Sequence, residues 1–445
     1  MSRVLVATPE PIARRLAGPG IRAAQIARVL AADHDVTLCS LDGASTSPID
    51  GRPVVESPGL DLDRFDAAVV QGRVTTALPE LIESGIPLAI DWFDPFHTEA
   101  LHRGGSDRIR RMDLVEGARQ TIDVQAHRGD FFLCSNDSQR KHWLGWLAAA
   151  GRINHLNHEA DPTFRALIDV VPFGIEVRRL QRRRPLRATF PSIGPDDPVI
   201  LWAGGLHDWL DPLTVIRAMP DVLDRHPDAR LVFLAGPHPN TSIEQMGMRG
   251  RAIELSRDLK LFGEHVLFAT SWIDYEDRLD WLADASVGVV ADAGHLESTL
   301  SHRTRLLDHL GAGLPTVSTE SDPAATIVAA AGAGRLVAPG DPTALSGELS
   351  SILADPDDLE SMATAATSLG RALSWENTLA PLVRWVGNPR RASDRVAGSI
   401  TGQGGGAAEA PLDRIVGRAR MHLSEGGVRQ LTDRVVASGK RRFRR

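Results

Sequence analysis

The segment 294–318, GHLESTLSHRTRLLDHLGAGLPTVS, carries the residues best suited to chemistry. It follows the apolar run VGVVAD, and the spacing of its leucines predicts a helix that begins near Arg303. Arg303, Thr304 and Arg305 would then lie at a helix N-terminus, where free N–H groups and the positive end of the helix dipole favour an anion. Two guanidinium groups at this position could bind a diphosphate, because guanidinium donors pair with phosphate oxygens in a bidentate manner.

Two carboxylates accompany these arginines. Glu297 precedes the expected helix and Asp308 lies on its polar face. A carboxylate repels a nearby phosphate, so we expect both residues to accept hydrogen bonds from sugar or ribose hydroxyl groups. The alternative is a solvated charged helix with intrahelical pairs such as Arg305–Asp308.

A second candidate segment, 199–220, reads VILWAGGLHDWLDPLTVIRAMP. A predicted strand runs into Gly204 and Gly205, and a helix follows with Asp211 as a good N-cap. Glycine lets a ligand approach the backbone closely, so the two glycines are candidates for phosphate contact. Trp209 could stack on a ring of the ligand. The alternatives are an ordinary tight turn and a packed tryptophan.

Two further segments follow predicted strands in the first half. In LAGPGIRAAQIARVL, Gly18 and Gly20 open an amphipathic helix and are candidates for a ligand-binding loop, with an ordinary helix start as the alternative. In PLAIDWFDPFHTE, Asp94 and His97 could orient a hydroxyl group or bind a sugar. A single histidine is more often structural, and that reading stays open for His97.

Short apolar strands alternate with longer helical patterns along the chain, which predicts βαβ units and parallel, doubly wound sheets. The pattern closes near VVPFGIEV and restarts at VILWAGG after a charged, proline-containing stretch. We therefore expect an α/β protein with two Rossmann-like domains that face each other across a cleft, with ligands at the carboxyl ends of the strands. The predicted parts are an N-terminal domain (1–178), a linker (179–197), a C-terminal domain (198–373), a closing helix (374–388) and a flexible basic tail with amphipathic helices (389–445).

Composition narrows the class of protein. The 445 residues are 42% hydrophobic and 24% charged, which is typical of a folded soluble protein. No apolar run reaches the ~20 residues needed to span a bilayer, and MSRVLVATPEP is expected to form a strand rather than a secretory signal. Cys39 and Cys134 are isolated, which fits a reducing cytosol better than a disulfide framework or a metal site.

The charge distribution bears on possible partners. The net charge of -7 argues against bulk nucleic-acid binding. The segment 411–445, in contrast, holds ten Lys and Arg against three Asp and Glu, and the stretch 103–128 is also basic. Such segments could rest on an anionic membrane surface, with a solvated face or an unstructured tail as the alternative. The expected location is the cytoplasm, with a peripheral position at the inner face of the cell membrane as an option.

The run ESTLSHRTRLLDHLGAGLPTV resembles the donor-site motif of bacterial GT-B glycosyltransferases of family 4. By that resemblance Glu297 matches the acid that contacts the transferred sugar, and Asp308 matches the acid that binds the nucleotide ribose. Ten residues separate the two acids, more than in the family motif, and the second acid is Asp. The family usually places an arginine and a lysine just after the Gly204–Gly205 turn, where this chain has His207, Asp208 and Trp209.

The resemblance implies a hexosyltransferase-type enzyme that moves a sugar from a nucleotide-diphosphate sugar to a hydroxyl acceptor. It implies retention of the anomeric configuration, no metal or other cofactor, and a carbohydrate or lipid-linked acceptor in cell-envelope polysaccharide or glycolipid synthesis. The first domain would bind the acceptor and the second the donor. Arg303 and Arg305 would stabilise charge on the leaving diphosphate. The alternatives are a nucleotide-sugar 2-epimerase of the same fold and a non-catalytic scaffold with a degenerate donor site.

Overall fold

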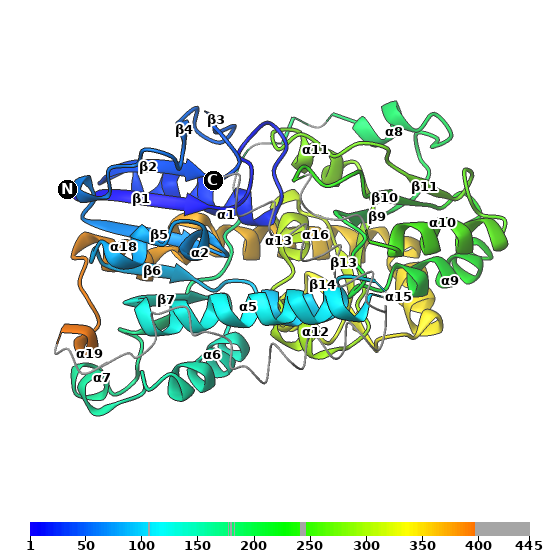
Figure 1. Ribbon diagram of the computed structural model, residues 1–445. Coiled ribbons are helices and arrows are strands. Elements are labelled where there is room, and N and C mark those ends of the chain that lie inside the picture. Colours follow the sequence, from blue (N-terminus) through cyan, green and yellow to red (C-terminus); the bar gives the residue numbers. More distant parts are fainter. Residues whose placement is uncertain (106, 177, 179, 182, 241–245, 397–445) are drawn as a thin grey trace, which may run out of the picture. The chain divides into compact units, whose positions relative to one another are not determined.

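The first half of the chain forms a sheet of eight strands (Figure 1). In a computed structural model, residues 1–396 are described except 106, 177, 179, 182 and 241–245. The spatial order is β3-β4-β2-β1-β5-β6-β7-β8, parallel except for the β3–β4 pair. The strands are β1 (Arg3–Thr8), β2 (Asp35–Ser40), β3 (Ser45–Thr46), β4 (Pro53–Glu56), β5 (Ala67–Gln71), β6 (Leu88–Asp91), β7 (Phe131–Cys134) and β8 (Ile168–Val170).

Helices connect these strands in the manner of repeated βαβ units. They are α1 (Gly18–Leu30), α2 (Val74–Ala77), α3 (Glu80–Glu83), α4 (Phe96–Glu99), α5 (Arg108–Arg128), α6 (Asp137–Ala149) and α7 (His155–Ala160), with 3-10 turns η1 (Leu62–Arg64) and η2 (Ala100–His102). Four of the strands, β1, β5, β6 and β7, are buried along nearly their whole length, as expected for a parallel sheet that is covered on both faces.

The second half forms a parallel six-stranded sheet with the order β11-β10-β9-β12-β13-β14. Its strands are β9 (Val199–Ala203), β10 (Arg230–Leu234), β11 (Val266–Phe268), β12 (Val287–Val290), β13 (Thr316–Thr319) and β14 (Gly334–Val337). Its helices are α9 (Pro212–Leu223), α10 (Met248–Asp258), α11 (Arg278–Ala283), α12 (Leu296–Leu300), α13 (Thr304–Ala312), α14 (Pro323–Ala330), α15 (Pro342–Ala354) and α16 (Pro356–Ala372). The predicted α/β fold with two doubly wound, Rossmann-like halves is confirmed.

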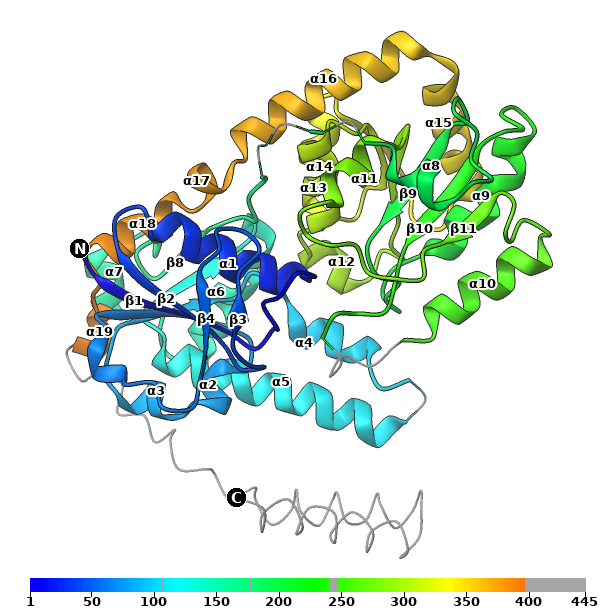
Figure 2. The ribbon, with the colours of Figure 1, turned by 90° about the horizontal axis from the view of Figure 1, so that it is seen from above.

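The end of the described chain returns to the first half (Figure 2). Where one closing helix was expected, the structure has α17 (Trp375–Thr378) and α18 (Ala380–Gly387), because the helix breaks before Ala380-Pro381. Trp385 of α18 stacks on Phe131 of β7 with 5.8 Å between ring centroids. Both halves therefore belong to one compact unit.

The segments predicted as a linker and as a flexible tail both contain short helices that pack on the rest of the chain. The predicted linker includes α8 (Pro185–Thr189), whose Leu186 is fully buried. The first residues of the predicted tail form α19 (Ser393–Val396), and Asp394 makes a buried ion pair with Arg152 at 2.8 Å. This pair explains why the chain stays on the first half up to α19. The rest of the basic tail, with its predicted amphipathic helices, lies outside the described residues.

No helix in the described part of the chain is both long and apolar enough to cross a membrane.

Candidate functional site

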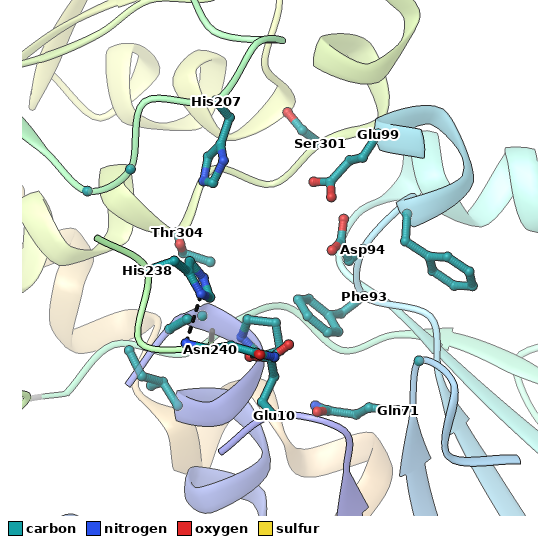
Figure 3. Close-up of a pocket in the computed structure, with 18 of the residues that line it drawn as sticks. Glu10, Gln71, Phe93, Asp94, Glu99, His207, His238, Asn240, Ser301 and Thr304 are labelled. Atoms are coloured by element: carbon teal, nitrogen blue, oxygen red, sulfur yellow. Dashed lines mark hydrogen bonds between the residues drawn. The ribbon is translucent and has the colours of Figure 1, made fainter. Parts of the chain in front are cut away.

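A cavity of about 950 Å³ is lined by residues of both halves. The loops after β1, β5 and β6 line it from the first half, and the loops after β9 and β10 and the α12–α13 connection line it from the second (Figure 3). These are carboxyl ends of parallel strands, the usual place for a ligand in such sheets. The cavity is the cleft that the alternation of strands and helices predicts.

Arg303 lies just before α13 and is buried in a ring of acids. Its Nη1 and Nη2 donate to the two carboxylate oxygens of Glu297 at 2.8 and 2.6 Å. Its backbone N–H donates to Asp322 at 3.0 Å. Burial lowers the pKa of Arg303, but Glu297 and Asp322 together raise it above its usual value. The positive charge of Arg303 is therefore balanced by Glu297 and Asp322. This pairing argues against the predicted role of Arg303 as a second phosphate-binding cation.

Arg305 has a different environment, although it is only two residues away. Its Nη2 donates to the Gly205 carbonyl at 3.2 Å, and its guanidinium lies over the Trp202 ring at 5.0 Å from the centroid. Its Nη1 is buried and has no hydrogen-bond partner, and no ion pair to Arg305 occurs among the described residues. Burial, and then the charge of Arg303, lower the pKa of Arg305 to about 9. A buried guanidinium without an ionic partner is costly, and a bound anion would lower that cost.

The Gly204–Gly205 turn places backbone beside this guanidinium. Gly204 has φ of +104°, a conformation that favours glycine, and a Cβ there would lie 3.7 Å from Nη2 of Arg305. The structure thus brings together the turn and the start of α13, which are a hundred residues apart in sequence. Thr304, the first residue of α13, and Gly18 also line the cavity, and a Cβ on Gly18 would lie 3.9 Å from the Thr304 hydroxyl.

Asp308 lines the cavity one turn further along α13 and pairs with Arg278 at 3.4 Å. Burial raises the pKa of Asp308, and Arg278 acts in the opposite direction. Arg278 also donates to Glu176 at 3.0 Å. The alternative of a solvated helix with an Arg305–Asp308 pair is not what the structure shows, because Asp308 pairs with Arg278 instead.

Trp209 and His207 line the cavity as a stacked pair, with ring centroids 4.6 Å apart and planes within 4°. Burial, and then Arg305, lower the pKa of His207 to about 3, so its imidazole is neutral at physiological pH. One face of Trp209 is thus occupied by a neutral ring.

Two candidates of the first half lie outside the cavity lining. A Cβ on Gly20 would meet Leu16 and the Pro11 carbonyl oxygen at 3.4 Å, so Gly20 permits close packing rather than ligand contact. His97 stacks on His142, with 3.0 Å between the Nε2 atoms, and packs against Trp143 and Trp146. Burial lowers its pKa to about 4. The structural reading of His97 is the one that the geometry supports.

Asp94, in contrast, lines the cavity, and so does Glu99 of the same loop and helix. Residues 97 and 99 point to opposite sides of α4, because successive residues are ~100° apart around a helix. The sequence pattern singled out the histidine of FHTE and missed the glutamate. The neighbouring Asp91 is engaged by Arg22, whose Nε donates to it at 2.7 Å in a fully buried ion pair.

Other residues that line the cavity were not predicted from the sequence. Asn240, after β10, donates to Glu10, after β1, at 3.2 Å and so bridges the two halves. His238 lies beside Asn240, and Tyr275 lies beside Arg278 (Figure 3 shows the first of these clusters). These residues lie in loops that follow strands or at the start of the next helix, and the sequence alone does not show which of these loops meet.

Comparison with known proteins finds a family model that is similar to the second half of the chain. Residues 197–355 match the family model described as glycosyl transferases group 1. No curated protein matches the sequence.

Solved structures resemble the chain over both halves. Sucrose-phosphate synthase from Thermosynechococcus elongatus is 16% identical with a TM-score of 0.65, over 86% of this chain and 98% of that one. HepE of Anabaena in complex with UDP-glucose is 12% identical with a TM-score of 0.61, over 87% of this chain and 100% of that one. WaaG, a glycosyltransferase involved in lipopolysaccharide biosynthesis, is 14% identical with a TM-score of 0.58, over 89% and 100%. Residues 197–355 are therefore similar to the group 1 glycosyl transferases, and the two halves together have the fold of GT-B glycosyltransferases.

Proposed function

We propose that the protein transfers a glycosyl group from a nucleoside-diphosphate sugar to a hydroxyl acceptor. The observation that carries this proposal is the buried guanidinium of Arg305, which has an unpartnered Nη1 and lies between the Gly204–Gly205 turn and the start of α13. A diphosphate would supply the missing acceptor oxygens and the missing negative charge. Arg305 thus supplies, from α13, the kind of charge that the family's arginine and lysine supply after the glycine turn.

Each neighbouring group then has a role in donor binding. Glu297 is fixed by Arg303 and would accept hydrogen bonds from hydroxyls of the transferred sugar, while Asp308 would accept from the ribose. During transfer the bond between the anomeric carbon and the phosphate oxygen breaks, and its electron pair goes to the diphosphate. Arg305 and the N–H groups at the start of α13 would stabilise that developing charge, which is the largest contribution expected in such a step.

The finer parts of the proposal rest on the comparisons and on the chain's surface. HepE, in complex with UDP-glucose, makes a uridine donor the first to test. WaaG, through its role in lipopolysaccharide biosynthesis, supports a cell-envelope polysaccharide or glycolipid product. Retention of configuration and the absence of a metal or cofactor are proposed from the family resemblance.

A peripheral position at the cytoplasmic face of a membrane is part of the same proposal. The exposed side chains at the start of α5 include Arg108, Arg110, Arg111 and Met112, and Leu101 nearby is 53% exposed. Basic residues beside exposed apolar ones suit an anionic lipid surface.

The direct test is turnover of a panel of nucleotide sugars that includes UDP-glucose, followed by proton NMR with a mixture of sugar and glycolipid acceptors. We expect release of the nucleoside diphosphate with appearance of a new glycosidic signal of the donor's anomeric configuration. Nucleotide binding without turnover would favour the degenerate scaffold. Conversion of the donor to its 2-epimer without an acceptor would favour the epimerase.

A further inference from the structure

The imidazole of His207 extends into the cavity without a polar partner. The side chain is half-buried, follows β9 and is directed into the cavity in Figure 3. Neither ring nitrogen has a hydrogen-bond or ion-pair partner among the described residues. Because each imidazole nitrogen can donate or accept a hydrogen bond, the ring is able to engage a ligand in the cavity.

This imidazole lies beside the same glycine turn as Arg305. A Cβ on Gly205 would lie 2.8 Å from Nε2 of His207, and the Gly205 carbonyl oxygen accepts from Nη2 of Arg305 at 3.2 Å. The lack of a side chain at position 205 therefore leaves room for the ring. Since both groups adjoin one residue, an anion bound by Arg305 would be within reach of the imidazole.

Trp209 fixes the orientation of the ring. The two rings stack with 4.6 Å between centroids and 4° between planes, and Trp209 is itself buried. The stack covers one face of the imidazole and leaves its nitrogens, at the ring edge, open to a ligand. An aromatic face at this distance also attracts a cation, so Trp209 would stabilise the imidazolium form of His207.

The charged groups that face His207 oppose its protonation in the free protein. Burial lowers the pKa of His207 to about 3, and four cationic or titratable groups act in the same direction: Arg305, His238, Arg303 and Arg103. The carboxylate of the next residue, Asp208, is paired with Arg251 at 3.0 Å. A diphosphate beside the ring would add negative charge and offset that of Arg305, so the pKa of His207 would rise.

Arg305 alone does not balance a diphosphate, which carries more than one negative charge. Its neighbour Arg303 is engaged by Glu297 and Asp322. A second positive charge beside the turn would therefore lower the cost of burying the anion.

We propose that His207 is this second cation: its imidazole takes up a proton from solvent when the nucleoside diphosphate binds, and the imidazolium donates a hydrogen bond to a phosphate oxygen. This inference rests on the proposed function, because it concerns the donor of the glycosyl transfer. The linkage has a definite sign. Near neutral pH the free protein holds no proton on this ring and the complex does, so nucleoside diphosphates bind more tightly as the pH falls.

The first experiment counts protons. UDP is titrated calorimetrically into the full chain at pH 6.5, in buffers of different ionisation enthalpy. We expect the wild type to take up about 0.5–1 proton more per UDP than His207→Gln. Proton exchange by UDP itself and by other groups of the cavity is common to both proteins and cancels in the difference. His155→Gln, which changes an exposed histidine at the start of α7, is the matched control and should behave like the wild type. Equal uptake by the wild type and His207→Gln would overturn the proposal.

The second experiment separates this role from a structural one. His207→Gln keeps a neutral N–H donor, so it should bind UDP about 5- to 10-fold more weakly than the wild type at pH 6 but within about twofold of it at pH 8.5. His207→Arg carries a permanent charge and should bind at least as tightly as the wild type at pH 8.5. Circular dichroism checks that both variants are folded. An equal loss of affinity at both pH values in His207→Gln would mean a structural role and contradict the proposal.

A third measurement uses inorganic pyrophosphate in place of a nucleotide. The ring resonance of His207, assigned by its loss in His207→Gln, is followed by NMR against pH with and without pyrophosphate. We expect the anion to raise the pKa of His207 and to leave that of His155 unchanged. If pyrophosphate raises this pKa but no nucleoside diphosphate binds, the proposed function fails and the anion site stands. If UDP binds and the pKa of His207 does not move, the role of His207 fails and the proposed glycosyl transfer stands.

Discussion

Arg303 and Arg305 show how two like residues on one turn can acquire different tasks. The first donates to Glu297 at 2.8 and 2.6 Å, so its charge holds an acid in place. The second has a buried Nη1 with no partner, so its charge is available for a ligand. The difference comes from the acids that each guanidinium can reach, and residue type alone does not reveal it.

This difference predicts opposite effects on stability. Arg303→Ala would leave Glu297 and Asp322 buried without their cation, and we expect the free energy of unfolding to fall by about 3–5 kcal/mol. Arg305→Ala removes a cation that has no acidic partner, so it should cost far less or even stabilise the ligand-free protein. Urea unfolding of both variants without ligand checks this, and an equal loss for the two would count against the assigned pairings.

At the scale of elements, close approach of backbone at the junction of the two halves depends on Gly174. A Cβ at this position would lie 2.5 Å from Cδ2 and 2.6 Å from Cα of Trp375 in α17. Trp375 is fully buried, and its backbone cannot retreat as a flexible side chain could.

We therefore expect Gly174→Ala to lower the free energy of unfolding by about 1–3 kcal/mol through overpacking. Gly347→Ala is the matched control, because Gly347 lies inside α15 and a Cβ there would meet nothing within 4 Å. The control should be neutral or stabilising by about 1 kcal/mol. Thermal unfolding of the two variants tests this expectation. Similar melting temperatures would mean that α17 can move away from a Cβ at position 174.

The elements themselves were largely predictable from sequence, and the site only in part. Strands such as VLVAT and VGVV are short apolar runs between helical patterns, and this alternation determines a doubly wound fold. Gly204 could be named because it follows a strand, and Arg305 because the leucine spacing predicts a helix that begins beside it. Glu99 could not be preferred over His97, because the orientation of the four-residue helix α4 depends on its packing against α5 and α6. The pairing of Arg303 with Glu297 likewise depends on the path of the chain between two short helices.

At the scale of the whole molecule, polar contacts between the halves surround the cavity. Gln25 of α1 donates to the Tyr275 hydroxyl at 2.8 Å, and that hydroxyl donates to Glu176 at 2.7 Å. Glu176 also accepts from Arg278, which pairs with Asp308. The residue proposed to bind ribose is therefore linked to the junction between the halves, so donor binding and the relative placement of the halves are expected to affect each other.

Global stability should also depend on pH through buried histidines. Burial lowers the pKa of His309 to about 3, below its unfolded value of about 6.5. The unfolded chain then binds more protons in this range, so the contribution of His309 is present above about pH 6.5 and is lost as the pH falls through the folded pKa.

Buried carboxyls with a raised pKa change the stability in the opposite direction as the pH falls. The prediction therefore concerns the difference between the wild type and a variant that lacks only His309. From pH 7.5 to pH 5, the wild type should lose about 2 kcal/mol more unfolding free energy than His309→Gln. Urea unfolding at the two pH values measures this. A variant with the same pH dependence as the wild type would show that His309 becomes protonated without unfolding.

The most direct test of the account is calorimetric titration of UDP, and then of the other nucleoside diphosphates, into the full chain and into Arg305→Ala. Loss of charge-assisted hydrogen bonds to phosphate should weaken binding by about 10- to 100-fold, while Arg225→Ala, an exposed arginine at the end of α9, should bind like the wild type. Equal affinity of Arg305→Ala and the wild type, or no binding of any nucleoside diphosphate to the wild type, would contradict the central claim that Arg305 holds the diphosphate of the donor.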